Sequence, residues 1–381
     1  KARTIEKYLG SNYQVVASGI SSTGIPKLAL DGLIQDLYAI EDSHLQLDGD
    51  WWDQNAIDDL SIGNKLFFAS GDIAVTDDEM TTMLVFNKEL IEENQLEDPY
   101  QLVRDDKWTM DKMYEMCKAV AKDGGDGVMN IAGEEDTWGL IGAAFDCYRL
   151  ILGGNAPMVS KNENDLPVIS VTNAYNVDVF LDVYEIMTDK SRVAWWEQYY
   201  RWDDYENGRK LTDQFYAGRV LFMVSDVCSM NDERMLNSQI QYGVLPLPKY
   251  NEEQTHYAST INPYKFTCVS LPRDTFVDTD KTTFLLEAMA YYNKSEVTPL
   301  YYETTLKSKR LLDESSEEML DIIFSNRIID LANIFNWDDC IQYYNQMIMG
   351  AGNAVVSFME SRESRMQEGI DQTVELFRDL K

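Results

Sequence analysis

Carboxylates are the most abundant groups with chemical potential in this sequence, and four of them lie close together: Asp72, Asp77, Asp78 and Glu79. Two carboxyl groups can hydrolyse a glycosidic bond when they oppose each other at about 5–5.5 Å or 6.5–9.5 Å. Ionised carboxylates can instead accept charge-assisted hydrogen bonds from the hydroxyl groups of a sugar. Acids that are neighbours in sequence do not by themselves supply the opposed geometry, so binding is favoured over hydrolysis.

Other reactive groups are sparse. The 381 residues include two histidines, His44 and His256, which argues against a histidine-based metal site or catalytic triad. The five cysteines show no CxxC pair and no metal spacing, so buried apolar cysteines are the better interpretation, with one disulfide left open. The loop at residues 122–127 (KDGGDG) lacks acids at the first and third positions of a calcium loop. A net charge of −32 makes nucleic acid and anionic membranes poor partners.

The four acids lie between two apolar runs. Residues 65–69 and 83–86 are predicted to be short buried strands, and a helix is expected from Glu89. Gly63 and Asn64 predict a tight turn, because both residue types tolerate positive φ. Residues 71–79 are too polar for a core element, so we expect a ligand-facing crossover between two lobes. The chain is long enough for two lobes.

The segment GNKLFFASGD…MTTMLVFNKELIEE resembles the extracellular solute-binding proteins of family 1, the sugar-capturing subunits of ABC importers, a group that includes maltose-binding protein. With WWDQNAIDDLSI before it, the segment is similar to lipoproteins of Gram-positive gut anaerobes. The resemblance continues along nearly the whole chain and is strongest at residues 212–226 (TDQFYAGRVLFMVSD). There, Gly218 is expected to end a helix in a left-handed conformation before a strand at residues 220–224.

The resemblance implies an α/β, periplasmic-binding-protein-like fold of two α/β lobes with a hinge and an interlobe ligand cleft. It implies a receptor that captures a carbohydrate, foremost an oligosaccharide, by hinge closure and delivers it to ABC transporter permease subunits. It also implies that the protein is not an enzyme, needs no cofactor or metal, and is a monomer. The expected location is extracellular, as a lipoprotein on the cytoplasmic membrane whose lipid anchor is absent from this chain.

The same resemblance predicts how the chain divides. Residues 1–80 plus 262–302 are expected to form the N-terminal lobe, and residues 81–261 plus 303–381 the C-terminal lobe. Crossings are expected near Glu79, Thr260 and Tyr302. Members of the family begin with a strand, a helix and a second strand ahead of the helix fragment at residues 4–9, so the first elements of the N-terminal lobe are expected to be missing from this sequence.

Ligand contacts are predicted from loops that follow strands. A strand at residues 13–17, a Ser/Gly-rich loop at 18–24 and a helix from Pro26 form a layout in which hydroxyl groups and helix N-terminal amides face a ligand, although plain turn chemistry stays equally open. By resemblance, the loop after residue 224 and the return loop at 256–264 also line the cleft. The predicted contacts are Ser18, Ser21, Asp77, Asp78, Glu79, Glu135, Asp226, Tyr257, Asn262 and Trp337. For Glu135, a solvated acidic turn is the slightly favoured alternative.

Tryptophan supplies a flat apolar face for a sugar ring, worth on the order of 1 kcal/mol beyond burial. By resemblance, Trp337 occupies the place of an aromatic residue that stacks on a sugar. Of the adjacent Trp51 and Trp52, at most one can face a sugar, and Trp52 is the candidate. Residues 191–207 hold six aromatic residues, Trp195, Trp196, Tyr199, Tyr200, Trp202 and Tyr205. For them a ligand platform, an oligomer contact and a packed satellite core all remain open.

Two other classes of function stay open. A carbohydrate-active hydrolase would release reducing sugar, which a receptor would not. A surface adhesion or interaction protein would use the aromatic cluster of residues 195–202 and would not respond to a solute. The sequence does not name the solute, and the family also includes receptors for solutes other than sugars.

Overall fold

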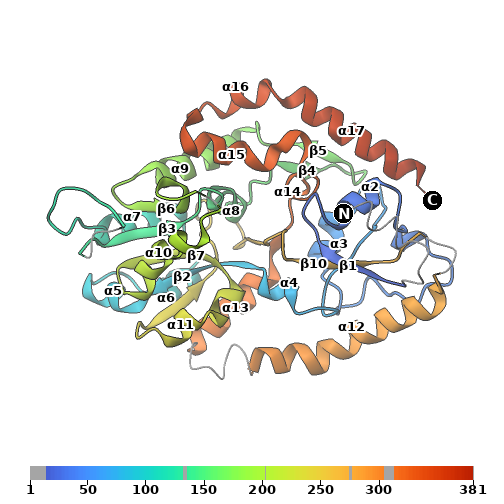
Figure 1. Cartoon of the computed structure of the whole chain (residues 1–381), viewed down its shortest axis with the longest axis horizontal. Coiled ribbons are helices and arrows are strands. Elements are labelled where there is room, and N and C mark those ends of the chain that lie inside the picture. The colour runs from blue at the N-terminus through green and yellow to red at the C-terminus, as the bar shows by residue number, and fades with distance from the viewer. Residues whose placement is uncertain (1–13, 132–134, 202, 274–276, 304–312, 381) are drawn as a thin grey trace.

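The computed structural model describes residues 14–131, 135–201, 203–273, 277–303 and 313–380. The chain forms two α/β bodies (Figure 1): one surrounds a five-stranded sheet, and the other surrounds β1, β10, α2 and α3. The helices α15, α16 and α17 run along one side of both bodies, and α4 lies between them. None of the described helices is both long and apolar enough to cross a bilayer.

The larger body is built on a mixed sheet with the strand order β6-β3-β7-β2-β8. The strands are β2 (Thr82–Asn87), β3 (Trp138–Gly142), β6 (Val193–Trp195), β7 (Val220–Asp226) and β8 (Tyr242–Leu245). β2 runs antiparallel to β7 and β8, whereas β3 runs parallel to β6 and β7. Every residue of β2 is buried, as expected for a central strand covered on both faces. The expected strands at 83–86 and 220–224 are thus confirmed.

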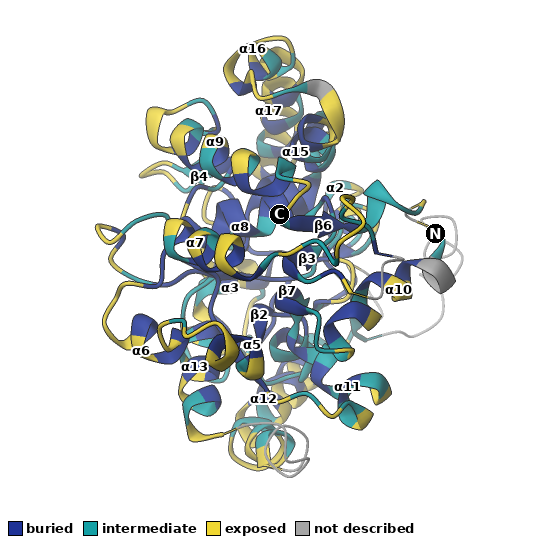
Figure 2. Cartoon of the chain, turned by 90° about the vertical axis from the view of Figure 1, so that its left-hand side faces the viewer, coloured by how far each residue is buried: buried dark blue, intermediate teal, exposed yellow. Residues whose placement is uncertain are grey.

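Helices cover this sheet on both faces, as Figure 2 shows by their buried inner sides. They are α5 (Lys88–Glu93), α6 (Pro99–Arg104), α7 (Met110–Val120), α8 (Asp146–Gly153), α9 (Ala174–Thr188), α10 (Tyr205–Tyr216), α11 (Glu233–Asn237) and α13 (Glu314–Ser325), with the short helices η2 (Trp196–Gln198) and η3 (Val227–Asn231). A hairpin, β4 (Val159–Lys161) and β5 (Pro167–Ile169), extends from this body. After α10, Gly218 has φ +78°, which confirms the left-handed residue expected before β7.

The smaller body contains β1 (Val16–Gly19) paired antiparallel with β10 (Thr267–Ser270), together with α2 (Ile25–Leu30), η1 (Leu37–Ala39), α3 (Gln54–Leu60) and α12 (Thr279–Tyr301). The strand expected at residues 65–69 is wrong. Within this run, Lys65 and Ala69 form only isolated bridges, to Ile62 and Val269, so no continuous ladder of strand pairing runs through it. The expected tight turn is confirmed, because Gly63 and Asn64 have φ of +61° and +59°.

Segments that are far apart in sequence meet between the two bodies. β9 (Ser259–Thr260) pairs in parallel with β11 (Arg327–Ile328), and Thr81 bridges Ile261. The segments after Glu79 and around Thr260, where crossings were expected, therefore lie side by side. The crossing expected near Tyr302 runs into residues 304–312, which lie outside the described residues. β11 also lies at this junction, where no segment near residue 327 was expected.

A buried guanidinium group lies where these segments meet. Arg327, whose side chain is 9% exposed, is 3.1 Å from Asp53, 3.0 Å from Asp78 and 4.0 Å from Asp77. Burial raises the pKa of Asp77 well above its usual range, and the charge of Asp78 adds to this effect while Arg327 opposes it. Asp77 and Asp78 (in α4, Thr76–Glu79) are therefore ion-pair partners inside the crossing. This placement corrects the expectation that they are open carboxylates facing a ligand.

The C-terminal segment packs against both bodies. It comprises α14 (Leu331–Phe335), η5 (Trp337–Gln342), α15 (Tyr343–Gln346), η6 (Met347–Ala351), α16 (Val355–Glu360) and α17 (Glu363–Asp379). Near its end, the ring of Phe377 lies 4.4 Å from that of Phe67 in the smaller body. α17 also contacts β5 of the larger body. The last helical stretch of the chain is divided in two, because α16 ends at Glu360 and α17 begins at Glu363.

The substitution Arg327→Ala tests the role of the buried ion-pair cluster. It leaves the carboxylates of Asp53, Asp77 and Asp78 buried without a counter-charge, so we expect a loss of about 3–5 kcal/mol in the free energy of unfolding, measured by urea titration. The control is Arg365→Ala, which breaks an ion pair with Asp338 on an arginine that is 60% exposed and should cost about 1 kcal/mol or less. Equal losses in the two variants would contradict the assignment.

Candidate functional site

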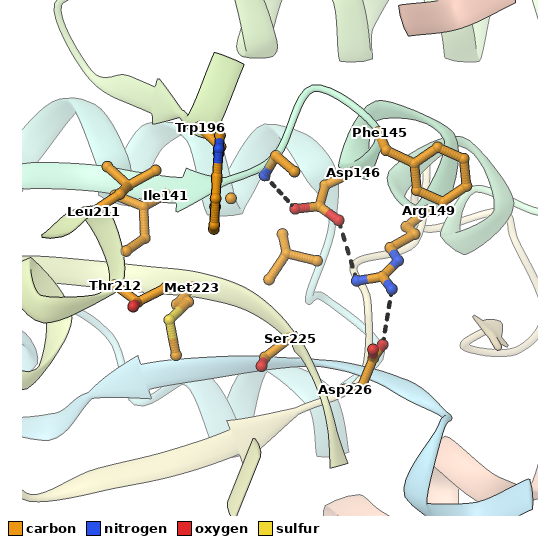
Figure 3. Close-up of a pocket in the computed structure, with 13 residues that line it drawn as sticks. Ile141, Phe145, Asp146, Arg149, Trp196, Leu211, Thr212, Met223, Ser225 and Asp226 are labelled. Atoms are coloured by element: carbon orange, nitrogen blue, oxygen red, sulfur yellow. Dashed lines mark hydrogen bonds and ion pairs between the residues drawn. The ribbon is translucent and has the colours of Figure 1, made fainter. Parts of the chain in front are cut away.

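A hollow opens at one end of the five-stranded sheet. β3 and β7 are parallel neighbours, so their carboxyl ends reach the same edge, where the side chains of the following loops converge. The cavity has a volume of about 260 Å³, slightly below the roughly 300–1,000 Å³ typical of small-molecule sites. Its lining (Figure 3) consists of Ile141, Gly142, Ala143, Phe145, Asp146, Arg149, Trp196, Leu211, Thr212, Met223, Val224, Ser225 and Asp226.

Three charged side chains form a chain along one wall of this pocket (Figure 3). Asp146 is the first residue of α8, and one of its oxygens accepts a hydrogen bond of 2.6 Å from the backbone N–H of Ala143. Arg149 follows three residues later on the same helix face, with Nη1 3.2 Å from Asp146 and Nη2 2.9 Å from Asp226. The side chains of these three residues are only 6–13% exposed. The guanidinium group thus joins a carboxylate in the helix after β3 to a carboxylate at the end of β7.

Burial controls the protonation of this wall. It raises the pKa of Asp146 to about 6, against the opposing effects of Arg149 and the Ala143 N–H, while the charges of Asp226 and Glu197 add to the increase. Burial disfavours the charged form of Arg149, but Asp226 and Asp146 outweigh this effect and raise its pKa above the usual range. Arg149 therefore stays cationic at all ordinary pH values, and Asp146 can exchange a proton in mildly acidic solution.

An aromatic wall is supplied by one of the two adjacent tryptophans. Trp195 is 5% exposed and donates its indole N–H to the carbonyl oxygen of Met187 at 2.9 Å, so it belongs to the core. Trp196 lines the pocket instead, and its indole N–H donates to the carbonyl oxygen of Arg201 at 2.9 Å. A Cβ atom on Gly208 of α10 would lie 1.9 Å from the Trp196 ring, so this close approach requires glycine.

The described members of the aromatic cluster of residues 195–202 lie in different environments. Trp195 packs in the core and Trp196 lines a pocket, whereas Trp202 lies outside the described residues. Beside Trp196, Glu197 accepts a hydrogen bond of 2.8 Å from the backbone N–H of Ala144, which holds the loop after β3 in place.

Two of the predicted ligand contacts meet beside the pocket. Asn262 donates from Nδ2 to Asp226 at 2.9 Å, and the hydroxyl group of Thr82 donates to the same carboxylate at 3.3 Å. Asn262 follows β9 on the segment that passes from the larger to the smaller body. Asp226 is therefore shared between the pocket and the crossing.

Three other predicted contacts lie outside the lining of this pocket. Ser18 is half-buried in β1, and Ser21 lies in the following loop, with its hydroxyl group 3.5 Å from that of Thr23. Glu79 accepts a hydrogen bond of 3.0 Å from the hydroxyl group of Tyr301 at the end of α12. A fourth, Glu135, is exposed at a turn ahead of β3, as its alternative interpretation states. The structure does not bring these four residues together with Asp226.

Two aromatic predictions need correction because their side chains are packed in the core. Tyr257 is 5% exposed, and its hydroxyl group donates to the carbonyl oxygen of Val103 and accepts from the N–H of Trp108. Trp337 is also 5% exposed and stacks on Phe335 with ring centroids 5.3 Å apart. Neither ring has an open face for a sugar.

The indole of Trp337 is held further by α17. Its N–H donates to the hydroxyl group of Thr373 at 2.9 Å, and Gly369 approaches the ring so closely that a Cβ atom there would lie 2.9 Å from it. Trp52, the weaker candidate, is 2% exposed and donates its indole N–H to Glu287 at 3.1 Å. Both tryptophans therefore serve packing in this structure.

The predicted ligand contacts do not include Phe145, Asp146, Arg149 or Trp196. One signal was available: an aspartate and an arginine three residues apart at the start of an otherwise apolar helix, directly after a strand. Which of Trp195 and Trp196 lines the pocket depends on where η2 and α10 place each ring, and this is not contained in the local sequence.

Comparisons with known proteins agree on the fold. The protein matches UgpB from Mycobacterium tuberculosis in complex with glycerophosphocholine, with a TM-score of 0.60 and 14% identity over 98% of this chain and 88% of that one. It matches a cyclo/maltodextrin-binding protein in complex with maltotetraose, with a TM-score of 0.58 and 13% identity over 99% of this chain and 85% of that one. The second of these proteins is named as a binding protein.

A third match is an ABC substrate-binding protein from Listeria monocytogenes in complex with cycloalternan, with a TM-score of 0.53 and 12% identity over 99% of this chain and 87% of that one. No family model and no curated protein matches the sequence. At these identities the likeness establishes the fold: the protein has the two-lobed α/β fold of periplasmic sugar-binding proteins.

The substitution Asp146→Asn tests the electrostatics of the pocket. Because folding raises the pKa of Asp146 to about 6, this group stabilises the folded protein below about pH 4, and the stabilisation is lost as the pH rises through about 6. Each pKa unit is worth about 1.4 kcal/mol, so from pH 4 to pH 7 the wild type should lose roughly 2–3 kcal/mol more stability than the variant. Urea titrations at both pH values measure this difference. Glu163→Gln, at an exposed position, is the control, and identical pH profiles for wild type and Asp146→Asn would refute the assignment.

Proposed function

We propose that this protein is the solute-binding receptor of an ABC importer and that it captures a carbohydrate, with an oligosaccharide as the leading candidate. The observation that carries the proposal is the pocket at the carboxyl ends of β3 and β7. It combines the indole ring of Trp196 with the polar wall of Asp146, Arg149 and Asp226. Sugars present apolar C–H faces that stack on aromatic rings and hydroxyl groups that donate to carboxylates. The bound carbohydrates in the neighbouring structures support the same class of solute.

The link between Asp226 and Asn262 supports a mechanism of capture. A solute in the pocket contacts the carboxylate that also holds the crossing segment, so occupancy and the orientation of the two bodies are connected. A solute that makes contacts to both bodies only when they close shifts the population toward the closed state. A permease that recognises the closed state then receives the loaded receptor. In this proposal Ser18, Ser21 and Glu79 supply contacts from the opposite side, and Glu135 is a weaker candidate.

The finer assignments belong to the same proposal. They are membership of family 1 of the extracellular solute-binding proteins, an extracellular lipoprotein attached by a lipid outside this chain, and a monomeric state. The proposed lobes are residues 1–80 plus 262–302 and residues 81–261 plus 303–381. The packing of α17 on Phe67 adds a contact from the second set of residues to the first.

The carboxylates that suggested a hydrolase are not arranged as hydrolysis requires. Asp77 and Asp78 are consecutive residues that both pair with Arg327 inside the crossing, so they do not oppose each other across a bond. Asp146 and Asp226 are joined through the same guanidinium group. No observation in the described residues favours hydrolysis or adhesion over solute binding.

A thermal-shift screen against mono- and oligosaccharides tests the proposal first. A solute that binds only the folded protein adds about 2.7 kcal/mol of stability at a hundredfold excess over its dissociation constant, which raises the melting temperature. The absence of a shift with every sugar would contradict the carbohydrate assignment.

The substitution Trp196→Ala then tests the site. Loss of the indole face should weaken binding of a sugar found in the screen at least tenfold, which is about 1.4 kcal/mol, as measured by calorimetry. Tyr38→Ala removes a 49% exposed aromatic ring outside the pocket and should leave the affinity unchanged. Unchanged affinity in Trp196→Ala would remove this pocket from the proposal.

A further inference from the structure

The pocket carries an excess of negative charge. Among its described lining residues, Arg149 is the single cationic side chain, whereas Asp146 and Asp226 are both acids. Glu197 adds a third carboxylate directly behind the loop after β3, where it accepts from the N–H of Ala144. The protein as a whole has a formal charge of −32, so the surroundings do not offset this local excess.

The one cation is already neutralised. Nη1 of Arg149 is directed to Asp146 and Nη2 to Asp226, at 3.2 and 2.9 Å, so its two terminal nitrogens are both paired with carboxylates. The Nε–H of Arg149 is buried and has no hydrogen-bond partner. A carboxylate or phosphate that took the place of Asp146 or Asp226 at a terminal nitrogen would displace that acid from its ion pair. The displaced carboxylate would then remain in a position that is almost inaccessible to water, which is unfavourable for an ion. Uncharged hydroxyl groups carry no such penalty, because they can donate to Asp146 or Asp226 while the ion pairs stay intact.

We infer that this pocket selects against anionic solutes, so that the captured solute presents an uncharged or cationic group to it, and not a carboxylate or a phosphate. The inference rests on the proposed receptor function and names the class of solute that the site accepts. It divides sugars sharply: neutral hexoses and amino sugars are admitted, and uronates and sugar phosphates are rejected. The electron-rich face of Trp196 acts in the same direction, because it attracts C–H groups and cations.

The protonation state of Asp146 contributes to this selection against anionic solutes. Because the pKa of Asp146 lies near 6, this acid is ionised at pH 7.5 and largely protonated at pH 5. The discrimination against anions should therefore weaken in acidic solution. Asp226, paired with Arg149 and bonded to Asn262 and Thr82, faces the same space from β7.

The charge of the pocket can be probed without knowing the solute. Iodide, caesium and acrylamide are anionic, cationic and neutral quenchers of tryptophan fluorescence. The quenching of Trp196 is obtained as the difference between the intact protein and the Trp196→Phe variant. At pH 7.5 and constant ionic strength, we expect Asp146→Asn to raise iodide quenching of Trp196 about threefold, the order expected for one charge at short range. Caesium quenching should fall, and acrylamide quenching should not change.

Matched variants distinguish the effect of the pocket charges on quenching from the effect of the overall charge of the protein. Glu163→Gln removes one charge at an exposed position outside the pocket lining and should leave all three quenching constants unchanged. Asp226→Asn provides a second pocket variant if Asp146→Asn alters the circular dichroism spectrum. If iodide quenches Trp196 as well as acrylamide does in the intact protein, or if the pocket variants behave like Glu163→Gln, the inference is overturned.

Solute binding supplies the second readout. Glucose, galactose and maltose are compared with glucuronate, galacturonate and glucose 6-phosphate in the thermal-shift assay. Among sugars that bind, we expect the anionic member to bind at least tenfold more weakly at pH 7.5, with a smaller difference at pH 5. Tighter binding of a uronate or phosphate would overturn the inference and leave the receptor function standing. If no sugar binds, the receptor proposal fails, and the quenching result still decides whether the pocket rejects anions.

Discussion

The arrangement of the two bodies depends on how one buried cation is neutralised. Arg327 comes from β11, Asp53 from the start of α3 and Asp78 from α4, so three segments that are distant in sequence supply the members of one ion-pair cluster. A buried guanidinium group is tolerated only when its charge is matched, and a buried carboxylate needs the same compensation. Each segment therefore depends on the others for a stable position, and the crossing between the bodies is held together by charge as well as by the short pairing of β9 with β11.

The pocket follows the same principle on a smaller scale. Arg149 compensates Asp146 in the helix after β3 and Asp226 at the end of β7, and Asp226 is also bonded to Asn262 on the crossing segment. A hydrogen-bonded path of three residues thus joins a cavity wall to the segment between the bodies. This continuity is what makes the cavity more suitable for a conformational response than an isolated surface hollow would be.

The matched structures share the fold of this protein although their sequences differ greatly from it. Matches at 12–14% identity extend over nearly the whole chain with TM-scores of 0.53–0.60. The shared property at such distances is the two-lobed architecture, while the lining of each site can differ completely. The features particular to this protein are therefore those of its own pocket, above all the pairing of Arg149 with two carboxylates and the placement of Trp196.

Local sequence patterns determined much of the fold. The strands β2 and β7, the left-handed residue at Gly218 and the turn at Gly63 and Asn64 follow from apolar runs and from residues that tolerate positive φ, which are properties of a few neighbouring residues. The resemblance of short motifs indicated the two-lobed architecture, and it identified Asp226 and Asn262, which the structure brings together.

Only the tertiary structure decided which polar and aromatic side chains are open to a solute. Asp77 and Asp78 are paired because Arg327 arrives from 249 residues away along the chain. Trp337 is covered because α17 and Phe335 close over it, and Trp196 is available because Gly208 lets α10 pass beside its ring. Burial and ion pairing depend on contacts between distant segments, and a one-dimensional pattern does not contain them.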